Sequence, residues 1–231
     1  MSIIEKAKEL VCSEEVQEFS LNLLSDCYAL LEGDITAAAR IVYSVTKGGL
    51  LLRESLFWNK FRYFLEEMDT DEDYLGNFCR VMAESGTKEE NQMRLLDTIE
   101  KIDTERKARY LVNASRCVAS RMIDRPTYFR ICHTLKRCLD EDLCFLQRSI
   151  LFDREYEYCE SVQELANCGL MRECVINANG PNSYCFTSFA KVLDIFSLSF
   201  GNVDRYPNPM RSYRELYPED VNTVVSNVVE F

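Results

Sequence analysis

The stretch SVQELANCGLMRECVINANGPNSYCFTSFAKVLDIFSL, residues 161–198, decides the expected fold of the C-terminal part of the chain. Val162 and Leu165 have helical spacing, and Gly169 follows as a residue that readily adopts the left-handed conformation on which many helices end. Turn-forming residues 177–183 then separate two short apolar runs, before a longer apolar run over 189–200. The stretch therefore predicts a helix, a β-hairpin with strands over 171–177 and 184–187, and a second helix.

Two motifs in this stretch, Leu165-Ala-Asn-Cys-Gly-Leu170 and Tyr184-Cys-Phe-Thr-Ser-Phe-Ala190, resemble the second half of a winged helix. The resemblance implies a compact unit of helix, hairpin and helix, and it carries no catalytic residue. In the DNA-binding members, the helix before the hairpin enters the major groove and the wing touches phosphates. Here that helix and its approach carry Glu155, Glu157, Glu160 and Glu164. A role in packing or in protein binding is therefore favoured for this element.

Upstream of this unit the pattern is helical throughout. Helical spacing predicts helices over 14–31, 35–45, 50–68, 71–84, 88–102 and 103–122. A further helix is expected over 125–152, with the acids 140–142 interrupting its charge pattern but not the helix. The predicted fold class is mainly α, with a multi-helix body (1–152) and a winged-helix-like unit with one β-hairpin (153–204). A linker and a docked C-terminal helix complete the chain (205–231).

The expected C-terminal helix has one apolar stripe, the candidate docking helix, formed by Val221, Val224, Val225 and Val228. Valine is a mediocre helix former, so packing has to hold such a helix in place. The chain's own body is the favoured packing partner, and a second subunit is the alternative.

Charge is strongly segregated along the sequence. Residues 106–137 contain nine Lys and Arg against one acid, which is +8, whereas the whole chain carries −11. Arg109, Arg116, Arg121 and Arg125 form the candidate basic binding face, because helical spacing brings part of this charge together. Such a face suits a phosphate-bearing ligand or nucleic acid. Pairing of these bases with the acids of 84–90 and 155–164 is the favoured alternative, since an acidic protein repels polyanions at long range.

Composition places the chain among cytoplasmic proteins without a transmembrane segment. No basic and apolar leader is recognisable, so the 11 cysteines are expected to be reduced thiols that mostly pack as small apolar residues. No apolar run reaches the ~20 residues that span a bilayer. The apolar and basic segment 37–64 is interpreted as a core helix in preference to a membrane-surface helix.

No metal, cofactor or catalytic residue is predicted. The acids of 69–73 fail the register of a calcium loop, because Tyr74 and Arg80 stand where glycine and glutamate are needed. His133, the only histidine, diverges on a helix from its neighbour Cys132 and forms no recognisable metal motif with Cys138. The common nucleotide-binding and hydrolase motifs are missing from the sequence, while an active site built from distant carboxylates or a Cys/His pair stays open.

The favoured function is a non-enzymatic protein-interaction or accessory protein, with a protein partner or self-association. The apolar pattern of 50–65 resembles that of uncharacterised helical proteins of bacteria and their phages, which suggests a phage or host-defence role. A nucleic-acid-associated regulator that uses the 106–137 segment is the first alternative. An enzyme without a linear motif is the second.

Overall fold

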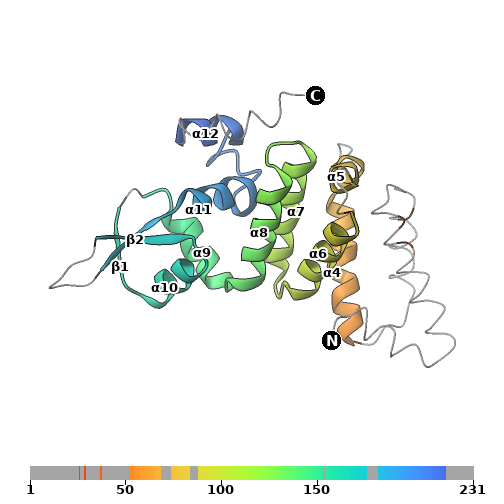
Figure 1. The fold of residues 1–231 in the computed structure, drawn as a ribbon, viewed down its shortest axis with the longest axis horizontal. Coiled ribbons are helices and arrows are strands. Elements are labelled where there is room, and N and C mark those ends of the chain that lie inside the picture. Colours follow the sequence, from red (N-terminus) through yellow and green to blue (C-terminus); the bar gives the residue numbers. More distant parts are fainter. Residues whose placement is uncertain are drawn as a thin grey trace. The chain divides into compact units, whose positions relative to one another are not determined.

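The computed structural model describes residues 26, 29, 37, 52–68, 74–83, 88–152, 154–175 and 182–216. The mainly helical fold class with a small β unit is confirmed, because helices dominate the described residues and one small antiparallel sheet accompanies them (Figure 1). The contacts divide the chain into two compact units, 1–102 and 103–231. The sequence placed its division at residue 152, whereas the contacts group the helices of 103–152 with the hairpin.

The described part of the first unit includes α4 (Leu52–Met68), α5 (Tyr74–Ala83) and α6 (Lys88–Lys101). Phe61 and Phe64 of α4 are buried, and the ring of Phe64 meets that of Phe78 on α5 edge-on at 5.8 Å. Nζ of Lys60 donates to the carbonyl oxygens of Glu100 and Ile102, both at 2.8 Å. This cation offsets the partial negative charge at the C-terminal end of α6.

The second unit begins with α7 (Glu105–Ala119) and α8 (Arg125–Arg137), which pack side by side (Figure 1). Both helices start at side-chain caps: Thr104 accepts from the backbone N–H of Lys107, and Asp124 accepts from that of Thr127. Pro126 occupies the first turn of α8, where its missing N–H costs nothing.

The single helix expected over 125–152 is wrong. The backbone is extended at Cys138 and Leu139, and a new helix, α9 (Asp140–Ser149), follows. Its first turn contains the acids 140–142, which stabilise the positive end of the helix dipole. The acidic cluster that looked like a surface feature of one helix therefore marks the start of another.

The predicted hairpin is present. After α10 (Glu160–Asn167), which ends at Gly169 with a φ of 74°, β2 (Met171–Val175) pairs antiparallel with β3 (Ser183–Phe186). A two-residue strand that the sequence pattern did not predict, β1 (Tyr156–Glu157), pairs with the other side of β3. The strand order is β1-β3-β2, so β1 and β2 form the two edges of this sheet.

The helix expected after the hairpin is present but changes type along its length. It runs as α11 (Ser188–Leu193) and then as a π-helix, η1 (Asp194–Leu198). Side chains of α7 hold η1: Asn113 donates to the carbonyl of Ser197 at 2.8 Å, and the thiol of Cys117 donates to that of Phe196 at 3.3 Å. Gln147 of α9 donates to the carbonyl of Leu198 at 2.8 Å. Three packed side chains thus depend on the carbonyl positions of η1.

A helix that the sequence pattern did not predict, α12 (Pro209–Leu216), lies within the segment 205–231 that was expected to contain a linker and the docked C-terminal helix. Proline at a helix start keeps a favourable φ and loses no hydrogen bond. The candidate docking helix with Val221, Val224, Val225 and Val228 lies outside the described residues, as do most of 14–45 and all of 69–73.

Candidate functional site

The four arginines of the candidate basic binding face occupy two helices and the turn between them. Arg109 and Arg116 lie on α7, Arg121 lies in the turn with a φ of 56°, and Arg125 is the first residue of α8. Arg109 and Arg121 are exposed, and the other two are half-buried. Among the described residues, no acid forms an ion pair with Arg109 or Arg125.

Two other bases of the 106–137 segment are paired. Nη1 of Arg106 lies 3.1 Å from a carboxylate oxygen of Asp140, whose charge raises the pKa of this guanidinium. Nζ of the buried Lys107 lies 2.7 Å from Asp103. The acids differ from those expected, which were 84–90 and 155–164. Arg106 and Lys107 therefore pair within the second unit, with acids other than those of 84–90 and 155–164.

A basic surface that the sequence analysis did not single out lies on the outer face of α8. Arg130, His133 and Arg137 are exposed at positions i, i+3 and i+7, while Ile131, Cys132 and Leu135 between them are buried. These three exposed residues are called the α8 ridge below. The alternation of basic and apolar positions along 130–137 was visible in the sequence. Charge counting over the whole 106–137 segment obscured it.

The α8 ridge lies on a helix without acids. Asp124 caps the N-terminus of α8, and the acids 140–142 follow its C-terminus, where Asp140 pairs with Arg106. The guanidinium of Arg130 lies 4.4 Å from the ring centroid of Phe189 on α11. Partial burial, followed by the charges of Arg137 and Lys136, lowers the pKa of His133.

A second surface surrounds the edge strand β1 and is called the 151–160 surface. Its exposed members are Leu151, Phe152, Arg154, Glu155, Glu157, Tyr158, Cys159 and Glu160. The guanidinium of Arg154 lies 5.5 Å from the ring centroid of Phe152 and 4.9 Å from that of Tyr156. Apolar and acidic side chains thus alternate over a short segment that the sequence analysis treated only as the acidic approach to the hairpin.

Asp194 is a fully buried acid of the second unit, with no exposed surface. One of its oxygens accepts from Arg205 at 2.7 Å and from the hydroxyl of Tyr206 at 2.6 Å, and the other accepts from Ser199 at 2.7 Å. Burial raises the pKa of this carboxyl, and the hydrogen bond from Tyr206 and the charge of Arg205 oppose that shift. Because both oxygens accept hydrogen bonds from within the unit, the network acts as a structural anchor.

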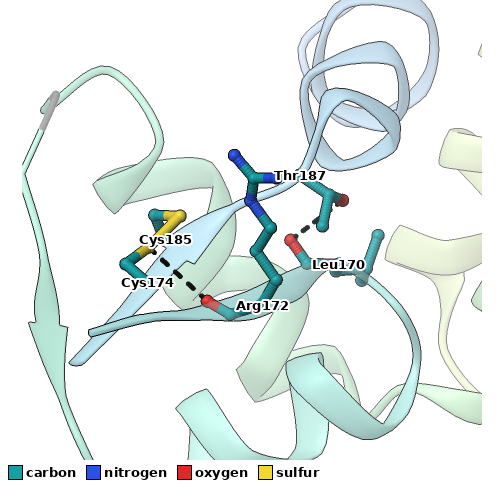
Figure 2. Close-up of a disulfide and its surroundings, with 5 residues drawn as sticks. All are labelled: Leu170, Arg172, Cys174, Cys185 and Thr187. Carbon is teal, nitrogen blue, oxygen red and sulfur yellow. Dashed lines mark hydrogen bonds between the residues drawn. A yellow bond between two sulfur atoms is a disulfide. The ribbon is translucent and has the colours of Figure 1, made fainter. Parts of the chain in front are cut away.

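The hairpin contains a disulfide between Cys174 and Cys185, with Cα atoms 6.0 Å apart (Figure 2). The expectation of reduced thiols is wrong for this pair. Cys185 lies opposite Arg172 in the strand register, and an irregularity between Glu173 and Val175 brings Cys174 beside it. Only the register of the two strands reveals this proximity, and neither cysteine matches a spacing motif.

The isolated histidine stays apart from the neighbouring cysteines. His133 is exposed, whereas Cys132 and Cys138 are buried. Within the described ranges, no group of three or more His, Cys, Asp or Glu side chains is arranged to hold a metal ion.

No family model matches the chain, and neither a curated protein nor a solved structure matches it. No helix in the described part of the chain is both long and apolar enough to cross a membrane.

Proposed function

We propose that this protein is a non-enzymatic interaction protein that docks a protein partner on the 151–160 surface. The observation that carries the proposal is the exposure of Leu151, Phe152 and Tyr158, whose side chains are 58%, 59% and 60% exposed. Covering apolar side chains of this size with a partner is favourable, because it removes apolar surface from water. Such groups beside a polar rim are typical of protein–protein interfaces.

The backbone of β1 supports the same proposal. Tyr156 pairs with Tyr184 of β3 on one side, and no strand of the described residues pairs with the other side. An extended segment of a partner can add to such an edge through backbone hydrogen bonds. Because β1 has only two residues, side chains around it have to supply most of the affinity.

The charges around β1 define the chemistry of the partner. Glu155, Glu157 and Glu160 are exposed, and the guanidinium of Arg154 lies over neighbouring aromatic rings. Two copies of this edge brought together would juxtapose like charges, which disfavours edge-to-edge self-association. A partner segment that combines apolar side chains with Lys or Arg complements the surface.

Site-specific photo-crosslinking tests the proposal. A photoreactive amino acid replaces Phe152 in one variant and Val203 in a control, since Val203 is also apolar and is 68% exposed. Both proteins are irradiated in cells that naturally carry the gene. We expect a discrete adduct from position 152 and none from position 203.

Specificity is tested in the same cells. The changes Leu151→Ser and Tyr158→Ser, added to the position-152 variant, should abolish the adduct because they remove apolar contact area. Equal adducts from positions 152 and 203, or an adduct that survives both serine changes, would contradict the proposal. Sedimentation of the purified protein then shows whether it self-associates. If the cross-linked species is a second copy, the prediction of a basic partner is contradicted.

A further inference from the structure

We propose that the α8 ridge, extended by Arg172 of β2, binds the phosphate backbone of a nucleic acid without sequence specificity. The proposal does not rest on the 151–160 surface, because the two surfaces share no residue. It assigns nucleic-acid contact to α8, whereas the winged-helix resemblance would assign it to the acidic helix α10.

The geometry of the ridge suits a row of phosphates. Arg130 and Arg137 are seven residues apart, which is about 10 Å along a helix axis. One strand of duplex DNA advances about 3.4 Å per phosphate, so this length corresponds to about three phosphates. His133 lies between the two arginines on the same face.

The arginines of the proposed site are available for a ligand. No acid among the described residues forms an ion pair with Arg130, Arg137 or Arg172. Arg172 and Arg137 are exposed. The guanidinium of Arg130 contacts the half-buried ring of Phe189. An arginine held over a ring keeps its outward-facing donors free for phosphate oxygens.

Arg172 follows Leu170 by two residues, and the carbonyl of Leu170 accepts from the backbone N–H of Thr187, the residue before α11. Figure 2 shows the side chain of Arg172 extending toward Thr187 and away from the disulfide. Thr187 is two residues before Phe189, over which Arg130 lies. The adjacent acid, Glu173, alternates to the other face of the strand, where the hydroxyl of Tyr184 donates to it at 3.3 Å. The acid therefore does not neutralise Arg172.

The net charge of −11 does not prevent such binding. At physiological ionic strength the Debye length is about 8 Å, so exposed charges farther away are largely screened. A phosphate backbone at the ridge therefore experiences chiefly the local positive charge. The negative charge of the whole chain instead predicts a slow association rate at low salt, because its repulsion of a nucleic acid then acts over a longer range.

The ridge fits nucleic acid better than an acidic protein. Phosphodiesters present a regular row of negative charges, and Phe189 beside Arg130 offers a half-buried aromatic edge to sugars or bases. Carboxylates on a protein surface rarely repeat at such short intervals along a line. Polyglutamate is therefore the comparison ligand in the test.

Fluorescence anisotropy of the full-length protein with a labelled 20-base-pair duplex and with 20-nucleotide DNA and RNA strands tests the proposal. With three arginine contacts, log K against log salt should have a slope of about −3 for the duplex. Affinity should then fall about 40-fold between 50 and 200 mM NaCl. Polyglutamate should compete poorly.

Two variants and one control locate the site. Arg130→Gln/Arg137→Gln removes two charges from the ridge and should reduce the magnitude of the slope by about two. Arg137→Glu/Arg172→Glu leaves the contact between Arg130 and Phe189 intact, so its loss of affinity cannot come from disturbed packing. Arg80→Glu/Arg94→Glu changes the net charge as much as Arg137→Glu/Arg172→Glu does, on exposed positions of the first unit, and should keep the wild-type affinity.

The proposal is supported if both ridge variants lose at least ten-fold affinity at 50 mM salt and keep the wild-type melting temperature, while the control keeps the wild-type affinity. It is overturned if wild type binds none of the three nucleic acids at 50 mM salt, if polyglutamate competes equally, or if the control loses as much affinity as the ridge variants. A ridge variant that melts early is replaced by Arg137→Gln alone, for which a slope unchanged from wild type also overturns the proposal.

Discussion

The carboxylate of Asp194 and the guanidinium of Arg205 form a two-point contact, with Nε and Nη2 of the arginine donating to one carboxylate oxygen at 3.1 and 2.7 Å. Asp194 belongs to η1, and Arg205 belongs to the segment that leads to α12. Tyr206 donates to the same oxygen. The pair therefore fastens the segment after the π-helix to the core of the second unit.

Asp194→Asn should destabilise the protein. The change removes the negative charge opposite Arg205, whose side chain is only 14% exposed, and it places amide donors near other donors. Breaking a buried pair in this way costs about 3 kcal/mol in the free energy of unfolding. Urea denaturation measures the loss. Asp204→Asn, an exposed acid in the same segment, is the matched control and should change stability by less than about 0.5 kcal/mol. Equal effects of the two changes would show that the pair contributes nothing.

The hairpin disulfide should stabilise the protein measurably. Cys174→Ser/Cys185→Ser opens a loop with a sequence separation of 11 and should lower the free energy of unfolding by up to about 3 kcal/mol under non-reducing conditions. In the presence of a dithiol reductant, wild type and variant should converge. The exposed thiol Cys159, changed to Ser, is the control. Peptide mass mapping that finds both cysteines alkylated in unreduced protein would refute this bond.

His133 should titrate below its ordinary pKa of 6.5, because partial burial and the charges of Arg137 and Lys136 disfavour the imidazolium ion. The chain has one histidine, so its NMR resonance needs no assignment. Arg137→Gln should raise the pKa, and added salt should raise it in wild type by screening. A pKa that responds to neither change would remove the evidence for a positive field at the α8 ridge.

The same shift has a consequence for stability. Below pH 6.5 the unfolded chain binds more protons at this histidine than the folded one, so its contribution to stability falls as pH drops from 6.5 through the folded-state pKa. Thermal melts of wild type and His133→Gln over pH 5 to 7.5 should therefore differ in slope, with wild type losing more stability toward acid. Parallel curves would contradict this prediction.

Purified protein should contain no stoichiometric zinc or calcium. The sequence has no recognisable ligand spacing for either ion. A structural zinc ion would release protons and stabilise the fold on binding. Elemental analysis after dialysis measures the content. About one zinc per chain would overturn the interpretation of the cysteines as packing residues and one disulfide.

The elements that could be predicted from the sequence are those that local chemistry specifies. Gly169 ends α10 in the left-handed conformation, and the turn formers of 177–183 separate β2 from β3, so both followed from residue type. The N-cap of α7, Thr104, likewise lies within one residue of the helix start predicted at 103. At these positions one side chain, or the backbone preference of one residue, is enough to determine where a helix or strand starts or ends.

The elements that could not be predicted depend on distant partners. The two residues of β1 are strand only because β3 offers them an edge, and no pattern of that length distinguishes them from a loop. The break at Cys138 and Leu139 has no glycine or proline to announce it. The π-helical register of η1 follows side chains of α7 and α9 that its own sequence does not contain.

The candidate sites show the same limit. The charge count of 106–137 was visible from the sequence, but which bases pair internally and which face water depends on Asp103 and Asp140. The exposure of Leu151 and Phe152 could not be foreseen either, because apolar residues in a helical pattern are expected to be buried.

The wide turn of η1 determines how this region would respond to a deletion. A π-helical turn holds one residue more than an α-helical turn, so removing one residue between Asp194 and Leu198 would let the segment close into an ordinary α-helix while the chain after it keeps nearly the same direction. The carbonyls that accept from Asn113, Cys117 and Gln147 belong to the turn that such a deletion would remove. A single-codon deletion here should therefore cost these hydrogen bonds without rotating the segment that leads to α12.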